Sequence, residues 1–141
     1  MSEISEAIRQ RVREFCRNRC SYCLSHQRYT MSKLEIEHIF PKSLGGSNEE
    51  NNLCLSCGLC NRYKGIQIEG FDNETEITVP IFNPRQQIWT EHFVWGADIS
   101  QITGLTAIGR VTVNALRLNN EIAVEVRRNW IIAGWHPPIL N

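Results

Sequence analysis

The sequence lacks the features that mark a secreted or membrane-inserted chain. No apolar stretch approaches the roughly 18 residues that a membrane-spanning helix needs. Residues 1–6 have neither the basic start nor the apolar run of a signal peptide. A net charge is missing too, because 15 Lys and Arg balance 15 Asp and Glu, and this argues against wholesale coating of a nucleic acid. We therefore expect a cytoplasmic chain that contacts no membrane.

The chain also has too few residues for more than one ordinary core. It has 141 residues, of which 42% are hydrophobic and 21% are charged, close to the average of globular proteins. We expect an α+β fold in three parts. These are an N-terminal basic helix in residues 1–19, a core in residues 20–69, and an extension in residues 70–141 that packs on the core.

The balanced charges are unevenly distributed along the chain. Residues 1–65 carry ten Lys and Arg against seven Asp and Glu, whereas residues 66–141 carry five against eight. Only the first half is therefore suited to phosphate. Its basic residues gather on both sides of the cysteine pairs, at Arg9, Arg11, Arg13, Arg17, Arg19, Arg62 and Lys64. A solvated helix face is the alternative interpretation of this pattern.

Cysteine, by contrast, is abundant in this sequence, with six residues. Two Cys-x-x-Cys pairs, Cys20 with Cys23 and Cys57 with Cys60, are separated by 33 residues. Three disulfides are the alternative, but without an export signal the pairs favour zinc. A four-thiolate zinc site is structural, because thiolates fill all four tetrahedral positions. The segment is short, so we expect zinc to supply folding free energy on the order of 10 kcal/mol.

Cys54 leaves a second ligand register open, because Cys54 and Cys57 also form a Cys-x-x-Cys. We favour Cys57 with Cys60, since Gly58 suits a tight knuckle turn and Cys54 alternates with leucines as a strand residue would. Cys16 is most simply a buried apolar side chain. A redox role for the pairs would need a thioredoxin-like βαβ context, which the flanking sequence lacks.

Local patterns place regular structure around the cysteines. Ser5 can cap a helix over residues 6–17, and residues 33–40 form an extended run that a glycine-containing loop ends. A short strand over residues 52–56 and a helix that starts at residue 61 follow. In the extension we expect a hairpin that pairs residues 93–95 with 100–103, and helices over 107–118 and 121–132.

The ordered motifs of residues 20–66 resemble the HNH endonucleases of the ββα-metal (His-Me finger) superfamily. The matching elements are Glu37-His38-Ile39 with Pro41, Gly45-Gly46, Asn52-Leu53, and Cys57 to Gly65, which is similar to the family's Cys-x-x-Cys-Asn-x-x-Lys-Gly ending. The chain departs from the commonest pattern in having Glu37 where Asp is usual and Asn61 where the last His of the motif stands. The resemblance implies a small zinc-stabilised ββα-metal core.

The resemblance also implies an enzyme that hydrolyses phosphodiester bonds of DNA, most simply double-stranded DNA. His38 is the candidate general base, because an imidazole ordinarily titrates near about pH 6.5. Glu37 and Asn61 would hold a catalytic divalent ion such as Mg²⁺ or Mn²⁺, which accepts oxygen ligands. Asn52 would tie the loop to the His38 strand and orient the imidazole.

One conflict is visible in the sequence. Strand alternation places Glu37 and His38 on opposite faces, so a shared site requires a local distortion near Glu37.

Arg62 and Lys64 are candidate phosphate contacts. We expect three other histidines, His26, His92 and His136, to be structural.

The extension contains the run Phe82-Asn83-Pro84-Arg85, which resembles a segment seen in some cyanobacterial HNH proteins. Its aromatic residues most simply bury against the core.

The alternative to an enzyme is a non-catalytic zinc module that binds nucleic acid or a protein partner through the same scaffold.

Overall fold

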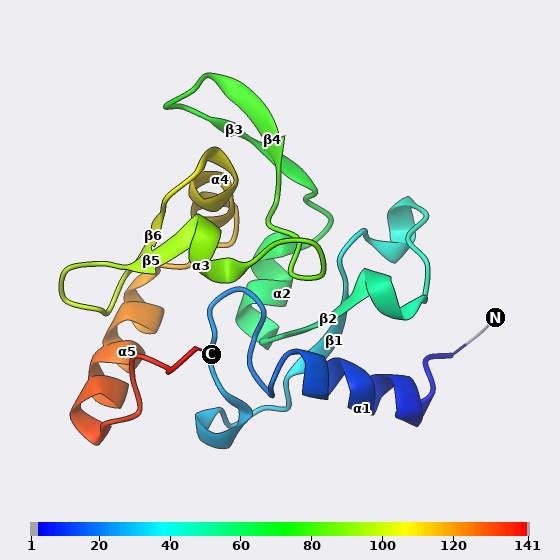
Figure 1. The fold of residues 1–141 in the computed structure, drawn as a ribbon, viewed down its shortest axis with the longest axis horizontal. Coiled ribbons are helices and arrows are strands. Elements are labelled where there is room, and N and C mark those ends of the chain that lie inside the picture. The colour runs from blue at the N-terminus through cyan, green and yellow to red at the C-terminus, as the bar shows by residue number, and fades with distance from the viewer. Residues whose placement is uncertain (1–2, 141) are drawn as a thin grey trace. The chain divides into compact units, whose positions relative to one another are not determined.

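The computed structural model describes residues 3–140 and has an α+β fold. Within these residues it contains five α-helices and three two-stranded antiparallel sheets. The described chain divides into two compact units (Figure 1). Unit 1 comprises residues 3–68 and 83–87, and unit 2 comprises residues 69–82 and 88–140. Among the described residues, no helix combines the length and the apolar character that crossing a membrane would require.

Unit 1 is built from two helices and one hairpin. Helix α1 (Glu6–Phe15) begins where the Ser5 hydroxyl accepts the Ile8 N–H at 3.2 Å. Strands β1 (Glu35–His38) and β2 (Leu53–Ser56) pair antiparallel in a continuous ladder, and helix α2 (Gly58–Lys64) follows. Helix α2 begins three residues earlier than expected, because the Cys57 side chain caps its N-terminus. Three short 3₁₀ helices lie at Gln27–Tyr29, Lys42–Leu44 and Glu50–Asn52.

The outer edge of β2 is covered by groups from outside the sheet. The Leu55 carbonyl accepts the Ser21 N–H at 2.8 Å, and the Leu55 N–H lies 3.3 Å from the Cys16 sulfur. The Leu53 carbonyl accepts Nε of Arg85 at 2.8 Å. Cys16 is therefore half-buried and accepts a hydrogen bond, which corrects the expectation of a buried apolar side chain. These contacts give partners to main-chain groups that an open sheet edge would leave unpaired.

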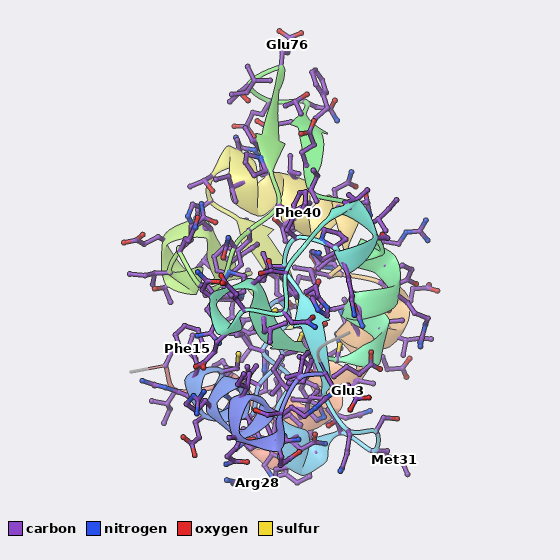
Figure 2. All side chains as sticks on the ribbon, turned by 90° about the vertical axis from the view of Figure 1, so that its right-hand side faces the viewer. Glu3, Phe15, Arg28, Met31, Phe40 and Glu76 are labelled. Carbon is purple, nitrogen blue, oxygen red and sulfur yellow. The ribbon has the colours of Figure 1, made fainter. Side chains whose placement is uncertain are left out.

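Unit 2 contains three helices and two hairpins. Strands β3 (Glu69–Asp72) and β4 (Ile77–Pro80) form a ribbon whose turn carries Glu76 (Figure 2). Helix α3 (Trp89–His92) leads into β5 (Phe93–Trp95), which pairs with β6 (Ile102–Gly104). Helices α4 (Ala107–Ala115) and α5 (Glu121–Ala133) follow, and α4 packs on β3, β4 and β6.

The core of unit 2 is mainly apolar, although it also buries the Arg127 guanidinium, which donates to the carbonyls of Ser100 and Leu118. Its most deeply buried hydrophobic side chains, each at most 2% exposed, are those of Phe82, Phe93, Ile102, Leu116 and Leu118. The rings of Phe82 and Phe93 meet edge to face with centroids 5.2 Å apart. The expected hairpin and both expected helices are present, and their ends differ from the expected ones by at most three residues. The β3–β4 ribbon and helix α3 were not expected.

Candidate functional site

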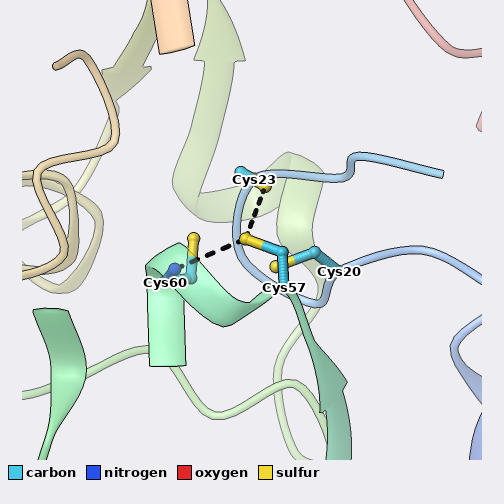
Figure 3. A group of neighbouring side chains, drawn as sticks. All are labelled: Cys20, Cys23, Cys57 and Cys60. Atoms are coloured by element: carbon cyan, nitrogen blue, oxygen red, sulfur yellow. Dashed lines mark hydrogen bonds between the residues drawn. The ribbon is translucent and has the colours of Figure 1, made fainter. Parts of the chain in front are cut away.

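The four expected cysteines meet at one point in unit 1 (Figure 3). Cys20 and Cys23 come from the loop after α1, whereas Cys57 and Cys60 come from the N-terminal end of α2. Their sulfur atoms all lie within 4.8 Å of one another, and those of Cys23 and Cys57 are 3.8 Å apart. Zinc–sulfur bonds of about 2.3 Å in a tetrahedron place sulfurs about 3.8 Å apart, so the cluster fits zinc.

The acid–base properties of the thiols agree with a metal site. Burial raises the pKa of the Cys20 thiol well above its usual value. Hydrogen bonds from Cys20 and Cys57 lower the pKa of Cys23. The cluster thus contains thiols that hold their protons and thiols that release them readily, and binding of zinc would expel the remaining protons.

The Cys57 and Cys60 register is confirmed, and Cys54 lies elsewhere. Cys54 is buried in β2, where its sulfur lies 3.0 Å from Oε2 of Glu37. Burial and the nearby Glu37 carboxylate raise the pKa of Cys54, so it remains a thiol that donates to this oxygen. Cys54 is consequently a strand residue with a polar partner.

His38 stands at the end of β1 in a partly exposed position, and its imidazole is held by the loop that follows. Nε2 lies 2.7 Å from Oδ1 of Asn48. An amide oxygen only accepts hydrogen bonds, so Nε2 carries the proton and the lone pair of the neutral ring is on Nδ1. The tautomer of His38 is therefore defined by Asn48, a residue that the sequence analysis did not single out.

Asn52 fastens this loop to the end of β1. Its Oδ1 accepts the Phe40 N–H at 2.8 Å, and its Nδ2 donates to the carbonyls of Phe40 and Ser47 at 3.1 and 2.9 Å. The loop is tight at Gly46, where a Cβ would collide with the carbonyl oxygen of Phe40. Asn52 thus ties the loop to the His38 strand, while the direct contact to the imidazole comes from Asn48.

Glu37 points into the interior, away from His38. The β1–β2 ladder is continuous through Glu37, so the expected distortion is absent and the two side chains lie on opposite faces. The Glu37 carboxylate is 4% exposed; Oε1 lies 2.8 Å from Nζ of Lys64, and Oε2 accepts from the Tyr22 hydroxyl at 2.8 Å. Burial and the neighbouring Cys54 and Glu37 side chains raise the pKa of Tyr22, which keeps its hydroxyl a donor.

Lys64 is placed differently from the expectation that it contacts phosphate. Its side chain is buried between Glu37 and the end of β1, and Nζ donates to the carbonyl of Ile39 at 3.0 Å and lies 3.5 Å from that of His38. A buried ammonium that is satisfied by these oxygens cannot reach a nucleic acid. Arg62, by contrast, is exposed on α2 and remains available as a phosphate contact.

Asn61 meets a different carboxylate from the one expected. Its Nδ2 donates to Oε1 of Glu35 at 2.7 Å, and Glu35 lies on the same face of β1 as Glu37. The structure thus brings Asn61 together with Glu35, whereas Glu37 pairs with Lys64. Alternation at two-residue spacing could have indicated Glu35 as a second carboxylate beside α2.

The remaining expected structural histidines have local partners. His26 caps a 3₁₀ helix by accepting the Arg28 N–H at 2.9 Å. Nδ1 of His92 lies 2.7 Å from the Thr106 hydroxyl, and Nε2 of His136 lies 2.7 Å from the Ile99 carbonyl.

Comparison with known proteins agrees with this geometry. The family model described as HNH endonuclease matches residues 20–67, which include all four cysteines, the β1–β2 hairpin and α2. Searches of curated proteins and of solved structures found no match to the chain. Residues 20–67 therefore belong to the HNH endonuclease family, and their four cysteines stand in the positions of a zinc site.

Proposed function

We propose that the chain is a divalent-metal-dependent HNH endonuclease that hydrolyses phosphodiester bonds of double-stranded DNA, with zinc as a structural ion. Membership of residues 20–67 in the HNH family supports a nuclease-like or nucleic-acid-related role. The observation that carries the catalytic proposal is the state of His38. Its imidazole is fixed in one tautomer by Asn48, with an unprotonated Nδ1, at a partly exposed strand end.

His38 acts as the general base in this proposal. Hydrolysis of a phosphodiester requires removal of a proton from the attacking water, and a neutral imidazole performs this transfer near neutral pH. Nδ1 of His38 accepts the proton, while the Asn48 contact at Nε2 stabilises the direction of the ring and the imidazolium that forms. Exposed Arg62 contributes positive charge for a phosphate on α2.

The residues that would hold a catalytic divalent ion only partly match the family expectation. Such an ion would neutralise charge that develops on the phosphate. Asn61 at the surface of α2 has Glu35 beside it, and both offer oxygen atoms of the kind that Mg²⁺ or Mn²⁺ binds. Glu35 nevertheless projects from the face of β1 opposite to His38, so these two residues do not complete a site with the general base in this arrangement. Glu37 does not fit as a ligand in this arrangement, because its oxygens are engaged by Lys64, Tyr22 and Cys54. We therefore assign Glu37 no step in catalysis.

The test is cleavage of supercoiled plasmid by zinc-loaded protein in Mg²⁺ or Mn²⁺. We expect wild type to nick or cut the plasmid, and His38→Ala to lose at least about 100-fold in rate, as removal of a general base does. His26→Ala is the matched control, because it removes a histidine of the same unit that caps a 3₁₀ helix and contacts the Tyr29 ring. Equal rates for wild type and His38→Ala under every divalent ion would refute the catalytic role.

A non-catalytic zinc module that binds nucleic acid is the second candidate. The burial of Glu37 against Lys64 favours it, because this carboxylate is withdrawn from the surface where a metal-dependent nuclease would use it. DNA binding that survives in His38→Ala, together with no cleavage by wild type, would select this function.

A further inference from the structure

The segment of residues 83–87 lies outside the HNH match, which ends at residue 67, yet it belongs to unit 1. The chain leaves unit 1 after residue 68, forms the β3–β4 ribbon, and returns for five residues before it continues in unit 2. Unit 1 is thus completed by a piece of the extension. The piece contains Arg85, whose side chain is directed at the hairpin that carries His38.

The returning segment is a closed turn that holds Arg85 in a defined position. The Arg85 N–H donates to Oδ1 of Asn83 at 2.9 Å, and the Gln87 N–H donates to the Asn83 carbonyl at 2.9 Å. The Gln87 side chain closes the turn by accepting the Asn83 N–H at 2.8 Å. An Asn at this position of a turn commonly binds the main chain two residues later.

Arg85 uses its guanidinium for contacts inside unit 1. Nε donates to the Leu53 carbonyl at 2.8 Å, and the guanidinium carbon lies 3.9 Å above the centre of the Phe15 ring, at the end of α1 (labelled in Figure 2). The cation is thereby stacked on an aromatic face and bonded to a strand edge at once. Nη2 is buried and has no hydrogen-bond acceptor among residues 3–140.

The bond to the Leu53 carbonyl links Arg85 to the part of β2 that adjoins His38 and its loop. Leu53 is the strand partner of His38, and it directly follows Asn52, which holds the loop. Its side chain is fully buried. A contact that fixes the Leu53 main chain therefore fixes both the residue opposite His38 and the anchor of the loop that carries Asn48.

We propose that Arg85 is a positioning residue for His38, supplied to the HNH domain by the C-terminal extension. Its catalytic consequence rests on the proposed nuclease function. Arg85 holds the Leu53 end of β2 against α1, and this keeps His38, Asn48 and Asn52 in register. It acts through the main chain of β2 and touches no substrate.

The kinetic test compares Arg85→Ala, Arg85→Lys and Arg128→Ala with wild type in plasmid cleavage. Arg128→Ala is the matched control, because it removes an exposed guanidinium of α5 whose only described ion pair is a 3.5 Å contact to Asp98. Displacement of a catalytic group by about 1 Å can reduce a rate about 100-fold, so we expect Arg85→Ala to reduce kcat about 10- to 100-fold. DNA affinity should stay within about threefold of wild type, as expected of a group that touches no phosphate.

Arg85→Lys separates positioning from charge and also serves if Arg85→Ala does not fold. Lysine keeps the positive charge but lacks the planar group that can stack and donate simultaneously. We expect kcat of Arg85→Lys to fall with zinc content unchanged, and about 10 mM guanidinium chloride to restore activity to Arg85→Ala in part. Wild-type kcat in Arg85→Lys, or a loss of DNA affinity without loss of kcat in either variant, would overturn the proposal.

A second readout does not depend on nuclease activity. ¹⁵N chemical shifts of the His38 ring report which nitrogen carries the proton. We expect the Nε2–H form in wild type and Arg128→Ala, and a shift toward the averaged values of mixed tautomers in both Arg85 variants. Unchanged His38 shifts in folded Arg85 variants would refute positioning. If wild type cleaves no DNA, the nuclease proposal fails, and the ring shifts still decide the role of Arg85.

Discussion

The interiors of the two units are stabilised by different kinds of interaction. Unit 1 has four converging thiols and a buried ion pair between Glu37 and Lys64, whereas unit 2 has an apolar centre around Phe82 and Phe93. Polar interiors are stable only when every group has its partner, while apolar interiors depend on packing. The candidate site is thus located in the unit that contains the four thiols of the metal cluster.

Removal of zinc is the change that should separate the two units most. A chelator, or Cys57→Ser, should destabilise unit 1 by on the order of 10 kcal/mol, because metal binding and folding are one process in so small a structure. Unit 2 contains none of the four ligands and should keep its structure. Hydrogen exchange measured by mass spectrometry should show lost protection in residues 3–68 and retained protection in α4 and α5. Equal loss of protection in both units would contradict the expectation that only unit 1 depends on zinc.

Disruption of one ion-pair partner should be the next largest effect. Lys64→Met leaves the Glu37 carboxylate buried without its cation, which commonly costs about 3–5 kcal/mol. The double variant Glu37→Gln, Lys64→Met removes both charges and should recover much of this loss. Thermal unfolding of the zinc-loaded proteins measures both losses of stability. A double variant as unstable as Lys64→Met would show that the buried pair contributes through its hydrogen bonds and not through its charges.

Phe93→Ala gives the matched change in unit 2. It should cost about 3–5 kcal/mol through a cavity in the apolar core. Its zinc affinity should equal that of wild type.

Local signals allowed much of the fold to be predicted. Ser5, Thr106 and Asn120 each accept the N–H three residues later, so the beginnings of α1, α4 and α5 could be read from the chain. The cysteine spacing likewise predicted the sulfur cluster, because two knuckles supply four ligands in one tetrahedron. Helix α2 began earlier than expected because a zinc-site cysteine also acts as its cap.

Side-chain partners across the fold could not be predicted from spacing. Alternation correctly placed Glu37 and His38 on opposite faces, and the continuous ladder confirms it. The role implied by the family resemblance required a distortion that this hairpin lacks. Which groups then meet Glu37 and His38, namely Lys64 and Asn48, depends on how α2 and the loop fold back. Arg85 lies still farther away, at a segment that returns from the extension.

The smallest expected effect concerns a polar bond within unit 2, and it depends on pH. Asp72 is buried and accepts two bonds from Arg110, at 2.9 and 3.0 Å, and two from Thr75, at 3.0 and 2.6 Å. The Arg110 guanidinium, followed by Thr75, holds the pKa of Asp72 well below its usual value. The ionised carboxylate therefore stabilises the folded unit fully above the unfolded pKa of about 3.9.

Acidification should remove this contribution progressively as the pH falls from about 4 toward the lowered folded pKa. Asp72→Asn should accordingly lower the Tm of unit 2 by several degrees near pH 7, and the gap to wild type should narrow below about pH 4. Asp98→Asn is the control. Hydrogen bonds from Ser100 also lower the pKa of Asp98, but its side chain is 56% exposed, so its gap should be smaller at every pH. A gap for Asp72→Asn that stays constant from pH 7 to pH 2 would show that the bond network works without the charge. The charge of Asp72 would then contribute little to unit 2, and the apolar contacts around Phe82 and Phe93 would carry more of its stability.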